Sequence, residues 1–326
     1  HLLRGRLVGG GTVLTSGLSV EPRAETKDLW CATNGPLSIG VKRDAFDLGI
    51  QKVFKRQALG KIDPRVYTDA SDLLGVGARK IADSEPWAFD RDVQWNNVMM
   101  RHDQRPEPTR DQNGDSCFGC GLCNYGCHFG HKLSMDLTYI VDAERAGARI
   151  HQNLPIERLE GHLEEGGMRV THLVFGRGLD ERVEVDHVVL SAGAVGSPAV
   201  LLRSEAHDGN WGRLPAFQND HVGTGLGFNY GSGVVARWKN ESARPGHMGF
   251  QIKFVATKGG DPDFEIPIPG KPSHRARYVL ENAFVPPGLM SNVVPGVGAG
   301  HRDWMTDYKK LAMCASTIGS PQTGVI

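Results

Sequence analysis

Residues 188–198 read VVLSAGAVGSP, in which a β-branched, apolar start gives way to small residues and then a proline. The apolar start predicts a buried strand, and the small residues after it predict a direct passage into a helix. In α/β folds, the N-terminus of a helix that follows such a strand is where backbone N–H groups meet the phosphates and ribose of a cofactor. Read alone, this stretch is about as consistent with a plain small-residue strand–helix junction as with the cofactor site of an α/β fold.

The composition is that of an ordinary globular enzyme. The chain has 326 residues, of which 40% are hydrophobic and 23% charged, enough for one large core or two smaller ones, and we expect two domains. Thirty-seven basic residues balance 37 acidic ones, so no overall field attracts nucleic acid or anionic lipid. The longest apolar stretch, 188–202, contains two glycines and a proline. It falls short of the roughly 18 uninterrupted apolar residues of a membrane span, so we expect no transmembrane helix.

Periodicity predicts the main elements on either side of the opening stretch. Helical spacing of apolar residues predicts helices over 69–83, 132–148 and 303–318. Residues 169–175 and 182–190 predict a hairpin whose second strand runs into the buried stretch 188–191. Short strands at 249–256 and 278–285, separated by Gly and Pro turns, indicate a separate antiparallel domain.

A glycine-rich loop lies near the start of the chain. Residues 4–17 read RGRLVGGGTVLTSG, with three consecutive glycines before Thr12. Such a run lets backbone N–H groups approach a ligand that a Cβ would exclude, and a diphosphate needs unhindered N–H donors and a hydroxyl. Alone, a loop of this kind is more often a structural turn than a cofactor site.

Three stretches together resemble the glucose–methanol–choline (GMC) oxidoreductases, in the order in which that family has them. They are Gly5-Arg6 with the loop 9–12, the turn and strand 148–156, and the stretch 188–204. Thr15 stands where the family usually has Asn. The resemblance implies that FAD is bound, and the expected contacts are Gly9, Gly10, Gly11, Thr12, Thr15, Ile156, Ser191, Ala192, Gly193 and Ser197.

The resemblance also implies a domain division. Residues 1–215 are expected to form part of a Rossmann-like FAD-binding domain, with a cysteine-rich insertion near 101–132, and residues 216–326 part of an antiparallel-sheet α+β substrate domain. Residues 281–288 and 308–312 are similar to the branch that oxidises long-chain alcohols and sterols. The family's G-x-G-x-x-G at the start and its His-containing catalytic segment near the end do not occur in residues 1–326. We therefore expect an internal portion of a longer protein whose catalytic His lies outside this chain.

Four of the six cysteines form one run, Cys117-x2-Cys120-x2-Cys123-x3-Cys127. This is the spacing of bacterial ferredoxin ligands, and the glycines between the cysteines let the backbone wrap a cluster. His128 stands where ferredoxins have Pro. Since no second run exists, three cysteines would hold a three-iron cluster, or all four a four-iron cluster.

Two other readings of the run stay open. Disulfides would suit a secreted protein, and four cysteines can also bind structural zinc, although zinc ribbons usually separate two pairs by a long loop. We rank the cluster before disulfides and disulfides before zinc, and we expect Cys31 and Cys314 to be buried apolar fillers. Lys132 and Ser134 follow the run; they either pack on the cluster or flavin, or begin a solvated helix.

The leading functional hypothesis is an FAD-dependent enzyme that oxidises the CH–OH group of a lipophilic alcohol. Hydride would pass to the flavin while a base takes the hydroxyl proton. Electrons would leave through the iron–sulfur cluster to a partner subunit, so the enzyme would be a dehydrogenase rather than an oxidase. The alternative is an electron-transfer or scaffold subunit that keeps a degenerate flavin fold.

Overall fold

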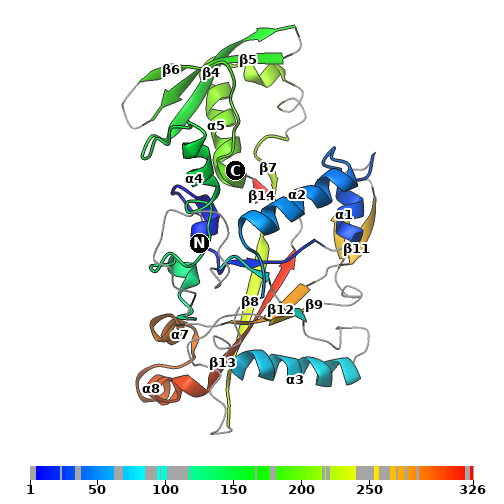
Figure 1. Cartoon of the computed structure of the whole chain (residues 1–326), viewed down its shortest axis with the longest axis vertical. Helices are drawn as coiled ribbons and strands as arrows, with labels where there is room; N and C mark the ends of the chain where they lie inside the picture. Colours follow the sequence, from blue (N-terminus) through cyan, green and yellow to red (C-terminus); the bar gives the residue numbers. More distant parts are fainter. Residues whose placement is uncertain are drawn as a thin grey trace. The chain divides into compact units, whose positions relative to one another are not determined.

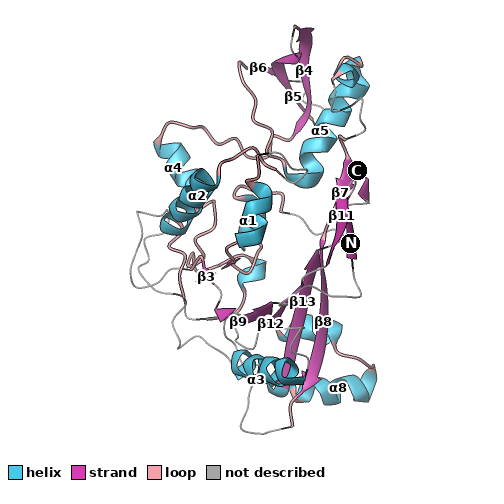
Figure 2. Ribbon diagram, turned by 90° about the vertical axis from the view of Figure 1, so that its right-hand side faces the viewer, coloured by secondary structure: helices cyan, strands magenta, loops and turns pink. Residues whose placement is uncertain are grey.

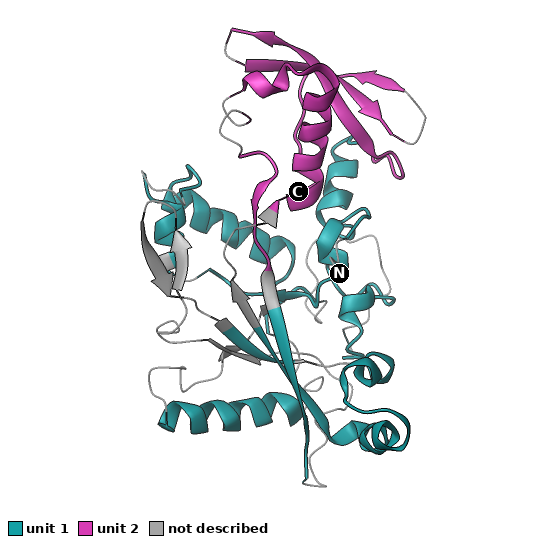
Figure 3. Ribbon diagram, turned by 180° about the vertical axis from the view of Figure 1, so that it is seen from behind, with its two compact units in different colours: residues 1–149, 231–265, 275–318 teal, residues 150–230, 266–274, 319–326 magenta. Residues whose placement is uncertain are grey.

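The computed structural model describes most of the chain (Figure 1). The described ranges are 5–22, 24–33, 38–61, 69–84, 94–95, 97–100, 117, 119–165, 167–176, 181–214, 217, 221–239, 253–256, 265–268, 271–275, 278–283, 286–319 and 324–325. Two compact units divide the chain (Figure 3). Unit 1 comprises residues 1–149, 231–265 and 275–318, and unit 2 comprises residues 150–230, 266–274 and 319–326. Each is described by itself.

A five-stranded sheet with the order β2-β9-β12-β13-β8 organises unit 1. Its strands are β2 Gln94–Trp95, β8 Asn229–Arg237, β9 Lys253–Ala256, β12 Tyr278–Ala283 and β13 Leu311–Gly319. The central strand β12 pairs antiparallel with β13 over six residues and with β9 on its other side. Helix α3, Asp69–Ser84, lies beside β9 and β12 (Figure 2). Ser71 of α3 donates a hydrogen bond to Asn282 of β12, so α3 covers the face of β12 that carries Asn282.

The remaining elements of unit 1 are short. They are η1 Gly10–Val13, β1 Leu18–Ser19, α1 Ala24–Trp30, α2 Arg43–Arg56, β3 Asn97–Val98, η3 Cys123–Tyr125, α4 Tyr139–Arg145, α7 Pro287–Val293, α8 Gly298–Thr306 and η5 Tyr308–Lys310. Strands β1 and β3 pair antiparallel. Val98, Met100 and Cys123 form a small buried core with Leu18 and Cys117 packed against it. The cysteine run is therefore anchored to the same core as the segment that follows the glycine loop.

Unit 2 is built on a three-stranded antiparallel sheet. Its elements are β4 Ile156–Glu164, β5 Gly167–Phe175, β6 Arg182–Glu184, α5 Gly193–Asp208, η4 Trp211–Arg213, β7 Thr224–Leu226 and β14 Gly324–Val325. Helix α5 packs on β4, where buried Leu159, Val200 and Trp211 form the core. Strand β7 pairs with β14. A further two-stranded sheet joins β10 Glu265–Ile268 to β11 Lys271–Arg275.

Several sequence predictions are confirmed. Helix α3 covers the predicted 69–83, β5 and β6 form the predicted hairpin, and a helix follows the small residues at 191–193. Helices and antiparallel sheets are mixed, as the expected fold class requires. The Rossmann-like detail and the domain division at residue 215 stay predictions. No helix in the described ranges has the length and apolar character needed to cross a bilayer.

Three predicted elements are wrong in extent. Residues 303–318 do not form one helix, because α8 ends at Thr306 and residues 311–319 form strand β13, of which 313–318 pair with β12. The predicted helix over 132–148 begins only at Tyr139, after a turn at residues 135–138. Strand β6 ends at Glu184, and the stretch expected to be buried leaves Val189 89% exposed while Val188 and Leu190 pack on the unit 2 core.

Candidate functional site

The glycine loop of unit 1 presents bare backbone at two positions. At Gly10 and Gly11 an added Cβ would meet no atom within 4 Å, so the main chain there is open to a ligand. Gly9 differs, because an added Cβ would lie 2.8 Å from Val13 Cγ2 and 3.0 Å from the backbone of Asp136. Both Gly9 and Gly10 have positive φ angles, of 89° and 59°, which favour glycine. Gly9 is therefore required for close packing against Val13 and Asp136, and Gly10 and Gly11 provide the open backbone surface.

The hydroxyl of Thr12 is used inside the protein. Its Oγ1 donates to the carbonyl of Gly9 at 2.6 Å and accepts from the backbone N–H of Met135 at 3.1 Å. These bonds close the loop and fasten it to the turn before α4. Thr15, the other predicted hydroxyl contact, donates to the Thr12 carbonyl at 3.4 Å and is exposed.

Lys132 joins the glycine loop to the cysteine run. Its side chain is fully buried, and Nζ donates to the carbonyls of Val13, Thr15 and Cys123 at 2.7, 2.6 and 2.7 Å. Burial lowers the pKa of Lys132, while Cys123 and Cys127 act in the opposite direction. The interpretation of Lys132 as a solvated helix start is wrong, and the cysteine segment is one of the surfaces on which it packs.

The four cysteines of the run line one cavity of about 160 Å³, together with aromatic and histidine side chains from the same segment. All six cysteines of the chain lie in the described ranges and are free thiols, so the structure contains none of the disulfides considered above. Gly119 and Gly121 both have a φ of 75°, a conformation that winds the chain around the cavity and that side-chain-bearing residues rarely adopt.

Burial dominates the electrostatics of the thiols. It raises the pKa of Cys117, and it raises that of Cys123 to about 12, with the charges of the other three cysteines acting in the same direction. Lys132 opposes this effect at Cys123. In the part of the chain that the structure describes, no three His, Cys, Asp or Glu side chains converge tightly enough for a single metal ion. The four thiols line a shared space rather than meet at one point.

The predicted contacts in unit 2 gather at the start of α5. Ser191, Ala192 and Gly193 are exposed, and Gly193 has a φ of 79° with open space where a Cβ would be. The first turn of this 16-residue helix carries no acidic side chain, and its N-terminal residue has no side-chain cap. Ser197 Oγ accepts a hydrogen bond from the Ala192 N–H at 2.9 Å. Backbone N–H groups with a positive helix end are the usual setting for a phosphate.

Ile156, the remaining predicted contact, is the first residue of β4 and is half-buried. His131 was missed by sequence reasoning: it is buried, lines the cysteine cavity and stacks with Phe129 at a ring distance of 6.0 Å. Its position directly before Lys132 is the signal that could have drawn attention to it.

Comparisons with known proteins agree with the resemblance in the sequence. Residues 93–228 match the family model described as GMC oxidoreductase. The match includes the cysteine run and the start of α5. An uncharacterized GMC-type oxidoreductase of Mycobacterium tuberculosis, in strain CDC 1551 / Oshkosh and in strain ATCC 25618 / H37Rv, is 26% identical over 327 residues. The alignment covers 99% of this chain and 43% of each relative, so the chain spans less than half the length of these relatives.

Proposed function

We propose that this chain is part of an FAD-dependent oxidoreductase of the GMC type that oxidises the CH–OH group of a lipophilic alcohol. The observation that carries the proposal is the family match over residues 93–228, which includes the exposed, uncapped start of α5. The alcohol and its lipophilic character rest on the sequence resemblance alone.

The residues at both predicted contact regions suit a dinucleotide. Gly10 and Gly11 offer backbone without side-chain obstruction, and Ser191 to Gly193 offer exposed backbone at a helix N-terminus. Thr12 would act through the loop it closes rather than through a free hydroxyl. Bound FAD would supply the hydride acceptor, and the chain would hold and orient it.

A pair of glycine variants tests the flavin assignment. Gly10→Val and Gly40→Val place the same side chain at positive φ angles of 59° and 71°, each with no atom within 4 Å of the new Cβ. The two changes impose similar backbone strain, but only Gly10 lies in the proposed loop. We expect Gly10→Val to lose FAD absorbance and Gly40→Val to keep it. If both keep stoichiometric FAD, the loop does not bind the cofactor.

The substrate class has its own test. In the full-length protein, which would contain the expected catalytic His, anaerobic addition of a long-chain primary alcohol should bleach the oxidised flavin band, whereas the methyl ether of the same alcohol should not, because it has no hydroxyl proton for a base to remove. Bleaching by neither compound would count against alcohol oxidation. Purified protein without any flavin would favour the alternative, an electron-transfer or scaffold subunit.

We also propose that Cys117, Cys120, Cys123 and Cys127 hold a three-iron or four-iron cluster that passes electrons to a partner subunit. Support comes from the ferredoxin-like spacing, the single cavity that all four thiols line, and the buried ammonium group of Lys132 beside them. A cationic neighbour offsets the negative charge that thiolate ligands bring into a buried site.

Iron and acid-labile sulfide measured on anaerobically prepared protein test the cluster. Cys120→Ser should lower both, and Cys31→Ser, a free cysteine outside the run, should leave both unchanged. Absence of iron and sulfide from the wild-type protein would reject the cluster while leaving the flavin proposal intact.

A further inference from the structure

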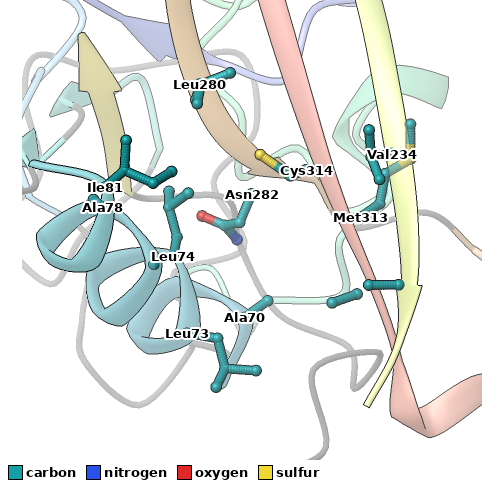
Figure 4. A pocket seen from close by; sticks show the side chains of 13 residues that line it. Ala70, Leu73, Leu74, Ala78, Ile81, Val234, Leu280, Asn282, Met313 and Cys314 are labelled. Atoms are coloured by element: carbon teal, nitrogen blue, oxygen red, sulfur yellow. The ribbon is translucent and has the colours of Figure 1, made fainter. Parts of the chain in front are cut away.

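A second cavity lies within unit 1, between α3 and the sheet (Figure 4). Its volume is about 260 Å³. None of the residues proposed to bind FAD or a cluster lines it. Its walls are mainly aliphatic on both the helix side and the sheet side. They include Leu73, Leu74 and Ile81 of α3, Val234 of β8, Leu280 of β12 and Cys314 of β13.

Two features of the walls indicate space for an occupant. Ile81 and Val234 line the cavity and are 39% and 68% exposed, so the cavity is open to solvent at these apolar side chains. Gly77 of α3 also lines it, and an added Cβ there would meet no atom within 4 Å. A glycine inside a helix is less favourable than alanine. The residue at position 77 thus leaves open a volume that a larger side chain would occupy.

One polar side chain marks the wall. Asn282 is 3% exposed, and Ser71 is its hydrogen-bonding partner among the described residues, with Ser71 Oγ donating to Asn282 Oδ1 at 3.4 Å. The amide nitrogen of Asn282 can donate to a ligand. No Asp, Glu, Lys, Arg or His is among the described residues that line the cavity. A charged ligand would find no counter-charge there, so the lining selects uncharged molecules.

We propose that this cavity binds a small, uncharged, largely apolar molecule with one hydrogen-bond acceptor, which faces Asn282. An engineered apolar cavity of about 150 Å³ in another protein binds benzene, so about 260 Å³ suits a substituted single ring or a short alkyl ketone. The apolar body of the ligand covers the exposed faces of Ile81 and Val234. The site is independent of the proposed flavin and cluster chemistry.

Acetophenone and ethylbenzene test the inference on the wild-type protein, since they have similar size and only acetophenone has an acceptor. Binding is measured by ligand-observed NMR and by the shift in thermal unfolding. We expect acetophenone to bind several-fold more tightly than ethylbenzene, and benzoate not to bind. Binding of neither neutral compound overturns the cavity assignment, and equal affinity for both overturns the role of Asn282.

Gly77→Leu should fill the volume and weaken acetophenone binding at least tenfold. Gly49→Leu is the matched control, because Gly49 also lies inside a helix, has open space at its Cβ and does not line the cavity. It should bind as the wild type does. Wild-type affinity in a folded Gly77→Leu variant overturns the inference. If that variant does not fold, the acetophenone and ethylbenzene comparison still decides the question. FAD content, measured alongside, should be unchanged in both variants.

Discussion

Replacing Lys132 with methionine is the sharpest test of how the glycine loop is held. The change keeps the length and most of the volume of the side chain but removes the ammonium group that bonds to Val13, Thr15 and Cys123. Three carbonyls then lose this charged donor at once. The buried Cys123 carbonyl keeps only the 3.3 Å hydrogen bond from the Gly126 N–H, whereas the other two carbonyls are partly buried and can recover some hydration.

The expected cost follows from opposing effects. Each hydrogen bond to a charged donor contributes about 1.5–3 kcal/mol, but burial of an ammonium group itself costs several kcal/mol, and the methionine relieves that cost. We expect a net loss of about 1–3 kcal/mol in the free energy of unfolding, because neutral carbonyls lose their strongest donor while no charge is left unpaired. If FAD binding must also supply about 1.4 kcal/mol to order the loosened glycine loop, the dissociation constant of FAD rises about tenfold.

Urea unfolding followed by tryptophan fluorescence and FAD titration measure the two effects. Lys27→Met is the control, because Lys27 is also buried but bonds to the carboxylates of Glu21 and Asp47, which water can reach. We expect a smaller loss of stability and unchanged FAD affinity for Lys27→Met. A Lys132→Met variant with wild-type stability and flavin affinity would refute the reasoning, and so would an equal loss in Lys27→Met.

Three further changes have defined outcomes. Gly161→Ala places a Cβ 2.0 Å from the carbonyl oxygen of Arg169 and should destabilise the protein by about 1–3 kcal/mol in urea; wild-type stability would contradict the packing. The Arg56 guanidinium lowers the pKa of Asp142, so their pairing stabilises the fold above the ordinary carboxyl range and is lost as pH falls through the lowered pKa. Arg56→Met should flatten this acid loss between pH 7 and 3, modestly because Asp142 is 41% exposed, and an unaltered pH profile would argue against it. Ser204→Ala removes the hydroxyl that accepts a hydrogen bond from the buried Leu159 N–H of β4, so amide hydrogen exchange in β4 should accelerate. Unchanged exchange would exclude this role of Ser204.

Local patterns predicted the elements whose partners are close in sequence. The apolar period of 69–84 needs only one face to be buried, and β5 and β6 are separated by six residues in the sequence. Strand β13 could not be predicted in this way. Leu311, Ala312 and Met313 favour helix by intrinsic propensity, but they begin strand β13, whose residues 313–318 pair with β12, about 30 to 40 residues earlier in the chain. Sheet pairing between distant segments overrides a weak local preference.

In the candidate site, too, local features could be predicted from the sequence and long-range contacts could not. Cysteine spacing alone predicted that four thiols gather, and the structure places all four around one cavity. The role of Lys132 could not be read from spacing, because two of its three acceptors lie 117 and 119 positions away. Nor could the sequence predict that the Thr12 hydroxyl is used by Met135, 123 positions later. Long-range bonds of this kind depend on the assembled core.

Cys123 differs from the other cysteines of the run, and the difference decides which variant is informative. It is buried in the core with Val98 and Met100, whereas Cys120 is half-buried and belongs to the cavity wall. A serine at position 123 would place a hydroxyl in that core and destabilise it whether or not a cluster is present. Loss of iron from a Cys123 variant would therefore mix a lost ligand with a damaged fold. At Cys120 the two effects separate, because a serine there leaves the core intact: loss of iron from a variant whose cluster-free form is as stable in urea as the cluster-free wild type points to the missing thiolate.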